Sequence, residues 1–172
     1  VIFMPLTYAD ARDNFRPGKV RFLFIGESRP AQGTFFYYEN SNLYRYTKQA
    51  FEHVSGALFN CETFKEYGCW LYDVCDTPVN GLEDDERILQ IQQGIPRMIV
   101  LLQQLLPEYV IFVKKGNFGR MVYPAVINTG LVDGEKIFLL PFPACGQQGR
   151  YVRELTAILD EVLFRGLNND EL

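Results

Sequence analysis

Apolar runs alternate with amphipathic stretches along most of the chain. Four predominantly apolar runs lie at residues 20–25, 69–74, 109–113 and 136–140. They do not show the polar/apolar alternation of a strand with one solvent-exposed face. Continuous apolar runs of this length are typical of strands in a parallel sheet that is covered on both faces. The sequence therefore predicts four buried strands in a central, mostly parallel sheet.

Helical spacing separates these runs. Apolar side chains recur three and four positions apart over residues 43–54, which predicts a helix. Ser41 or Asn42 is expected to cap its first turn, and Gly56 stands where a helix ends.

Two further helices follow in the same way. Acidic residues at 83–86 predict the start of a helix that runs to Pro107, with a break near Gly94-Ile95-Pro96. Residues 150–164 are strongly amphipathic and close the chain. Helices between parallel strands predict a three-layer α/β/α sandwich.

Length and charge narrow the class of protein. The 172 residues fit a single domain, 1–172, with residues 1–17 as an N-terminal arm or short helix. The chain has no run of about 18 apolar residues, so no membrane partner is expected. The first residues lack the basic and apolar regions of a secretory signal, and we expect a cytoplasmic protein. A net charge of −4 argues against a strongly basic nucleic-acid binder but leaves a local basic face open.

Cysteine and histidine usage argues against a metal centre. The four cysteines contain no C-x-x-C pair, so we expect reduced and mostly buried thiols. Cys75 follows the second predicted strand without a visible base, which favours a structural thiol over a nucleophile. Asp73 and Asp76 form a carboxylate pair, but no histidine or third acid is near them in the sequence. The only histidine, His53, is expected at the surface or rim.

The segment after the first strand, Gly26-Glu27-Ser28-Arg29-Pro30, is the first candidate site, because ligands bind at the carboxyl ends of parallel strands. Glycine permits a sharp turn and close approach of a ligand to the backbone. Glu27 can then act as a general base or stabilise a cation. The alternative is an ordinary turn in which Glu27 pairs with Arg29 or faces water.

An aromatic loop comes next, with Phe35, Phe36, Tyr37 and Tyr38 in succession. Four neighbouring rings cannot all face the core, so one or two are expected to be exposed or to line a cleft. Flat rings beside a carboxylate suit stacking on a planar ligand such as a nucleobase. The alternative is that the loop packs its rings on the sheet edge.

Two loops after later strands carry basic residues. The segment 140–150 contains two prolines and two glycines and leads to Arg150, where helix N-terminal amides can hold a phosphate. An ordinary strand-to-helix connection is the alternative. Lys114 and Lys115 follow the third strand and either touch phosphates or are solvated.

Taken in order, these segments resemble the uracil-DNA glycosylase superfamily, and especially its mismatch-specific branch. The resemblance covers residues 18–164 and lies in four motifs in the family's order: Gly26-Glu27-Ser28-Arg29-Pro30, Gly33-Thr34-Phe35-Phe36 leading to Asn42, Tyr72-Asp73 leading to Pro78, and Leu140-Pro141-Phe142-Pro143.

The resemblance implies base flipping followed by hydrolysis of the N-glycosidic bond of uracil or a related damaged base. Glu27 would position water and stabilise the oxocarbenium-like sugar. DNA, single-stranded or mispaired, would be the partner of a monomer. The residues implied to bind the base are Gly26, Ser28, Phe35, Phe36, Tyr37, Asp73 and Phe142. Those implied to contact DNA are Arg29, Lys114, Lys115, Ala144, Gly146, Gln147 and Arg150.

The chain departs from the family at two places. Phe142 and Ala144 stand where the family usually has a polar residue and a serine in the last motif. Glu27 is similar to the iron–sulfur branch, but that branch's cluster cysteines are absent, so we expect no cofactor. Two alternatives therefore stay open: a catalytically silent nucleic-acid or nucleotide binder, and an enzyme acting on a small nucleoside-like metabolite.

Overall fold

A four-stranded parallel sheet forms the centre of the molecule. The computed structural model describes residues 7–165. The strand order is β2-β1-β3-β4, and every neighbouring pair is parallel. The strands are β1 (Phe22–Gly26), β2 (Cys69–Asp73), β3 (Tyr109–Phe112) and β4 (Ile137–Leu139). The four predicted strands are thus confirmed to within two residues at each end.

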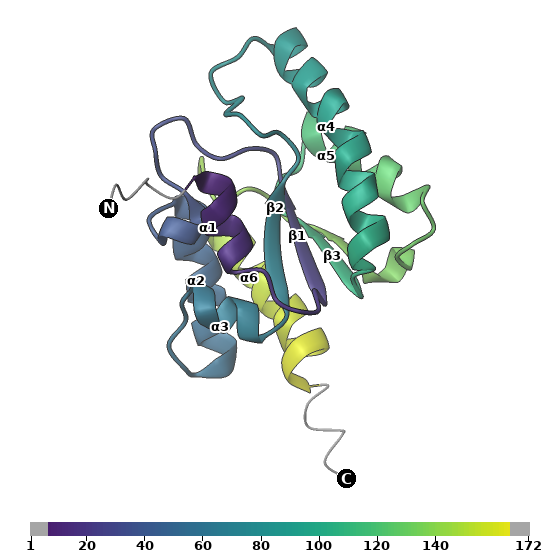
Figure 1. Cartoon of the computed structure of the whole chain (residues 1–172). Helices are drawn as coiled ribbons and strands as arrows, with labels where there is room; N and C mark the ends of the chain where they lie inside the picture. The colour runs from purple at the N-terminus through teal and green to yellow at the C-terminus, as the bar shows by residue number, and fades with distance from the viewer. Residues whose placement is uncertain (1–6, 166–172) are drawn as a thin grey trace, which may run out of the picture.

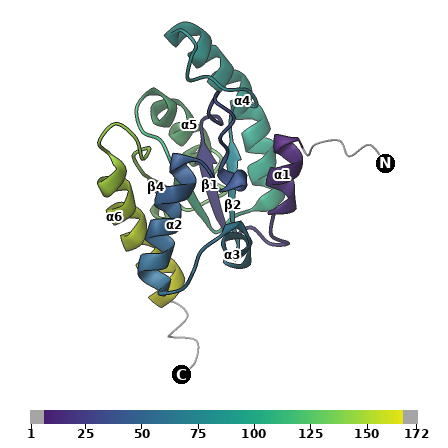
Figure 2. The ribbon, with the colours of Figure 1, turned by 90° about the vertical axis from the view of Figure 1, so that its left-hand side faces the viewer.

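Helices cover both faces of this sheet, as predicted for a three-layer α/β/α sandwich (Figures 1 and 2). One layer packs α2 against α6, with α1 and α3 beside them, and the opposite layer packs α4 against α5. The helices are α1 (Tyr8–Asn14), α2 (Asn42–Ser55), α3 (Cys61–Glu66), α4 (Asp84–Leu105), α5 (Asn117–Ile127) and α6 (Gln148–Leu159), which continues as the π-helical turn η3 (Asp160–Phe164). Two 3-10 turns, η1 (Phe36–Tyr38) and η2 (Gly134–Lys136), complete the fold.

The α2 helix begins and ends as its sequence predicts. Ser41 is the N-cap, and its hydroxyl accepts a hydrogen bond from the Tyr44 backbone N–H. Gly56 ends the helix in the left-handed conformation, with φ of 67°. Because this backbone region favours glycine, Gly56 stops the helix at low cost.

The predicted break in α4 is wrong, since the helix is continuous from Asp84 to Leu105. Gly94 instead allows a close contact: a Cβ there would come within 3.0 Å of the Val74 carbonyl oxygen, just beyond β2. The helix tolerates Pro96 at the loss of one backbone hydrogen bond. Glycine at position 94 therefore serves helix–strand packing rather than a turn.

Two helices were missed from the sequence. The α3 helix has only six residues, and Asn60 and Thr63 form a capping box at its start. The α5 helix contains Gly119 and Pro124, and because these residue types are typical of loops, its sequence does not predict a helix. The described part of the predicted N-terminal arm forms α1, whereas residues 1–6 lie outside the described residues.

The core is one continuous apolar cluster around the sheet. All five residues of β1 are buried, as expected for a central strand. Thr47 of α2 and Tyr151 of α6 are also buried, and their hydroxyls lie 2.7 Å apart across the helix pair. No helix within residues 7–165 is both long and apolar enough to cross a membrane.

Candidate active site

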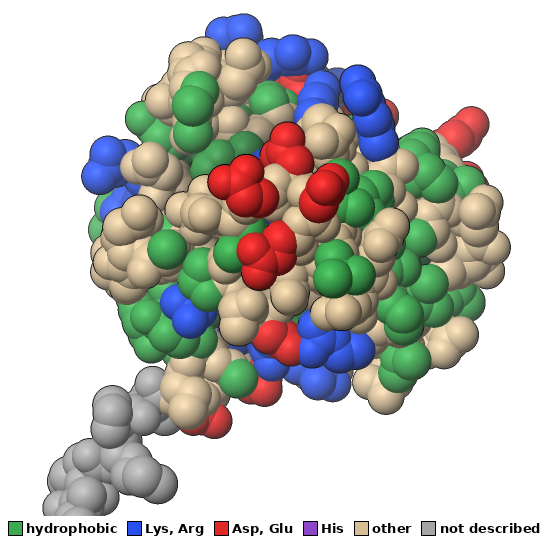
Figure 3. All heavy atoms as spheres, turned by 90° about the horizontal axis from the view of Figure 1, so that it is seen from above, with side chains coloured by type: hydrophobic (Ala, Val, Ile, Leu, Met, Phe, Trp, Pro, Cys, Tyr) green, Lys and Arg blue, Asp and Glu red, His purple; other side chains and the backbone are tan. Residues whose placement is uncertain are grey.

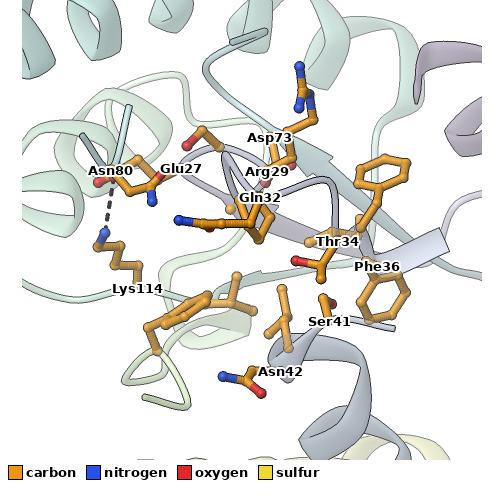
Figure 4. A pocket seen from close by; sticks show the side chains of 18 of the residues that line it. Glu27, Arg29, Gln32, Thr34, Phe36, Ser41, Asn42, Asp73, Asn80 and Lys114 are labelled. Atoms are coloured by element: carbon orange, nitrogen blue, oxygen red, sulfur yellow. Dashed lines mark hydrogen bonds and ion pairs between the residues drawn. The ribbon is translucent and has the colours of Figure 1, made fainter. Parts of the chain in front are cut away.

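A cavity of about 340 Å³ opens at the edge where β1, β2 and β3 end (Figure 4). This volume is at the lower end of the roughly 300–1,000 Å³ typical of small-molecule sites. Nine of the predicted site residues line it: Gly26, Glu27, Ser28, Arg29, Phe35, Phe36, Asp73, Lys114 and Phe142. The parallel sheet brings these distant segments together because all its strands end at one edge.

Glu27 is the best-anchored charged residue of the cavity. It follows β1 directly, and only 7% of its surface is exposed. Lys114 donates a hydrogen bond to its Oε1 over 3.0 Å (Figure 4, dashed line). Arg87 of α4 donates to the same oxygen, from Nε over 3.0 Å and from Nη2. The predicted alternatives, pairing with Arg29 or facing water, are therefore both wrong.

The second carboxyl group of the cavity belongs to Asp73, at the end of β2. Burial raises the pKa of this carboxyl to about 7, and the nearby charge of Glu27 adds to the effect, while Arg12 and Arg29 oppose it. Glu27 and Asp73 therefore sit in contrasting environments, one beside two cations and the other desolvated. Pairs of carboxyl groups in contrasting environments are typical of acid–base sites.

Aromatic rings form the apolar side of the cavity. Phe35 and Phe36 are 5% and 4% exposed, and both line it together with the half-buried Phe142. Tyr38, the last ring of the aromatic run, is exposed, as expected for one member of that run.

Tyr37 does not belong to this wall, which corrects the prediction that it stacks on a base. It is 4% exposed and lies outside the residues that line the cavity. Its hydroxyl donates to the Leu71 carbonyl oxygen over 2.8 Å and accepts from the Leu71 N–H over 2.7 Å. Its ring stacks on Phe15. Tyr37 therefore anchors the aromatic loop to β2.

Polar side chains that were not predicted complete the cavity. Gln32, Asn42 and Asn80 line it, each from a different segment of the chain (Figure 4). Ser28 accepts a hydrogen bond from the Val79 N–H and so ties the turn after β1 to the loop that carries Asn80. Asparagine and glutamine both donate and accept, which suits recognition of a polar ring edge.

The basic groups expected to face DNA are mostly engaged with carboxylates. Lys115 and Arg150 both pair with Glu154, at 3.8 Å and 2.6 Å. Lys114 pairs with Glu27. The guanidinium of Arg29 lies 3.8 Å above the centre of the Tyr8 ring.

The loop before α6 lies outside the cavity. Ala144, Gly146 and Gln147 do not line it, and Gly146 is left-handed with φ of 81°. Cys145 before it is also left-handed, with φ of 51°. Their contact with DNA stays a prediction.

The face around the cavity carries mixed charge. Figure 3 looks down on the edge where the strands end and shows acidic side chains near the centre, with most basic side chains toward the rim. The α4 helix begins on this side, and Asp84, Asp85 and Glu86 form its exposed first turn.

Metal ligands and reactive thiols do not cluster at the cavity. Within residues 7–165, no three His, Cys, Asp or Glu side chains come together as a metal site would require. Cys75 is buried, as predicted, and burial raises the pKa of its thiol to about 11. His53 is exposed, as predicted. Glu27 and Asp73 are the acidic side chains among the described residues that line the cavity.

The chain matches no family model and no curated protein sequence. The likeness to the glycosylase superfamily therefore rests on the four sequence motifs.

Proposed function

We propose that the chain takes a single nucleobase into this cavity and hydrolyses its N-glycosidic bond, with Glu27 as the catalytic carboxylate. One observation carries the proposal: a buried, ion-paired carboxylate stands at the end of β1 beside a pocket walled by Phe35, Phe36 and Phe142. An aromatic wall next to a fixed charge suits a planar base whose sugar becomes cationic in the transition state.

The base would enter the cavity after it leaves the base stack of the DNA. The half-buried ring of Phe142 offers a stacking surface, and Asp73 and Asn80 offer hydrogen bonds to the edge of the base. The absence of a side chain at Gly26 leaves room for the Asp73 carboxyl at the cavity wall.

Glu27 would act on the sugar. Its Oε1 accepts from Arg87 and Lys114, and Oε2 accepts no hydrogen bond from the described residues. Oε2 is thus available to hold a water molecule. As the C1′–N bond breaks, its electron pair leaves with the base, the water oxygen bonds to C1′, and the released water proton passes to Glu27.

A strand-nicking assay tests the proposal. Labelled oligonucleotides carrying uracil, thymine or hypoxanthine, single-stranded or opposite guanine, are incubated with excess protein and heated in alkali. We expect abasic sites from the wild type and at least a 100-fold loss in Glu27→Gln. Glu108→Gln is the matched control, because Glu108 pairs with Arg21 at the starts of β3 and β1, the opposite end of the sheet from the cavity. No product on any substrate, with oligonucleotide binding retained, would leave a catalytically silent binder.

A second candidate, an enzyme of free nucleosides, is favoured by the surface charge. Lys114, Lys115 and Arg150 are already paired with carboxylates, and the acidic first turn of α4 would repel a polyanion. Release of free base from nucleosides, together with oligonucleotide binding that is weak at about 50 mM salt, would favour this candidate. Binding that weakens steeply with added salt would favour DNA.

A further inference from the structure

Arg87 contacts the site although it lies far from Glu27 in the sequence, outside any local motif. It lies 60 residues from Glu27 in the sequence, near the start of α4. Its Nε and Nη2 both donate to Oε1 of Glu27, and about a quarter of its side chain is exposed. Nothing in the local sequence marks Arg87 as a site residue, because its neighbours form an acidic helix start.

The two cations on Glu27 differ in their access to a ligand. Lys114 lines the cavity, whereas Arg87 does not. Lys114 is therefore the cation on Glu27 that a ligand in the cavity can contact directly. The guanidinium is also the more rigid of the two partners, because its planar fork is preorganised.

The helix that carries Arg87 is fixed against the sheet. Gly94, two turns further along α4, packs on the backbone of Val74 so closely that a Cβ would not fit. Val74 follows β2, and its N–H donates to the Gly26 carbonyl oxygen over 3.0 Å. The α4 helix, which carries Arg87, and the turn that carries Glu27 are thus connected through short, buried contacts.

We infer that Arg87 is a positioning residue that holds Oε1 of Glu27 and thereby turns Oε2 toward the reacting sugar. The inference rests on the proposed function of Glu27. Arg87 itself touches no substrate in this arrangement. It acts by fixing the carboxylate while Lys114 is free to exchange between Glu27 and the ligand.

Variants of Arg87 test this role by separating catalysis from binding. In Arg87→Ala we expect kcat for abasic-site formation to fall about 100-fold, as for a misplaced catalytic group, while KM changes less than about threefold. Arg87→Lys should recover part of the loss. Guanidinium ion at low millimolar concentration should partly restore Arg87→Ala, because it can occupy the vacated space. Lys114→Ala should instead raise KM.

Arg97→Ala is the matched control. Arg97 lies on the same helix and pairs with the exposed Asp76, away from the cavity. We expect its kcat to equal that of the wild type and guanidinium to have no effect. Melting temperatures of all variants identify any that lose activity by unfolding, in which case Arg87→Lys decides the question.

Two results would overturn the inference. One is an Arg87→Ala protein with wild-type kcat, or with a raised KM and an unchanged kcat. The other needs no activity: a crystal structure of Arg87→Ala in which the Glu27 carboxylate keeps its wild-type position. A wild type that forms no abasic sites would overturn the proposed function instead, and the crystal structure would still decide whether Arg87 holds Glu27.

Discussion

Gly26 and Asp73 lie opposite each other at the ends of β1 and β2. A Cβ on Gly26 would come within 3.0 Å of the Asp73 Oδ1, a separation that real Cβ atoms essentially never show. The Asp73 carboxyl therefore occupies the space that a side chain at position 26 would take. The glycine after the first strand permits both the turn and the placement of a carboxyl group at the cavity wall.

Gly26→Ala should accordingly destabilise the protein. Because the methyl group must displace Asp73 or the strand, we expect a loss of about 1–3 kcal/mol in the free energy of unfolding in urea. Gly18→Ala is the control, since a Cβ at Gly18 has no atom within 4 Å, and its effect should stay within about 1 kcal/mol. Equal stability of the two variants would show that the Asp73 carboxyl moves aside freely.

Asp73 should make stability depend on pH. Burial raises the pKa of its carboxyl from an ordinary 3.8 to about 7. Between these values the folded protein keeps a proton that the unfolded chain has released. The stabilising contribution of this group is therefore complete below pH 3.8 and is lost as the pH rises through 7. Each pH unit in this window changes the free energy of unfolding by at most about 1.4 kcal/mol.

Asp73→Asn isolates this contribution, because asparagine does not titrate. Unfolding free energies of the variant and the wild type, measured from about pH 4 to pH 8, should diverge in favour of the variant as the pH rises. Parallel curves would mean that water reaches the Asp73 carboxyl in the folded protein and that its pKa is not raised.

Tyr37→Phe should cost stability and spare activity. The hydroxyl of Tyr37 serves both the N–H and the carbonyl group of Leu71, so its removal leaves two backbone groups of β2 without a partner. We expect a loss of about 1–3 kcal/mol in thermal or urea unfolding. The exposed Tyr38, replaced by Phe, is the control and should change stability by less than about 0.5 kcal/mol. If Tyr37→Phe kept its full stability but lost base cleavage, Tyr37 would instead belong to the ligand-binding site.

Thiol labelling should single out Cys145. It is exposed, whereas Cys61, Cys69 and Cys75 are buried, and burial raises the pKa of all three buried thiols. A thiol reagent at pH 8 should modify one cysteine in the native protein and four in denaturant, as counted by mass spectrometry. Cys145→Ser should abolish the native reaction. Rapid labelling of a second thiol would reveal local opening around the sheet.

The apolar pattern was sufficient to predict the sheet and the longer helices. The strands are buried on both faces, and burial leaves a continuous apolar run in the sequence, as at β1 and β3. Ser41 and Gly56 mark the two ends of α2 through contacts within a few residues. Because these contacts are local, the sequence also predicts where the helix begins and ends. The α3 helix is too short to show a period, and Gly119 and Pro124 hide α5.

The candidate site, too, could be predicted from the sequence only in part. The position of Glu27 after a strand, and of Phe35 and Phe36 in the following loop, predicted a cavity at the strand ends because all parallel strands finish at one edge. The sequence by itself thus determined the sheet, its edge and the carboxylate on it. The tertiary structure alone decided that Glu27 pairs with Arg87, that Tyr37 turns inward, and that Gly94 packs against Val74 after β2. These contacts join residues that lie 20 to 60 positions apart in the sequence, and only the tertiary packing brings them within reach.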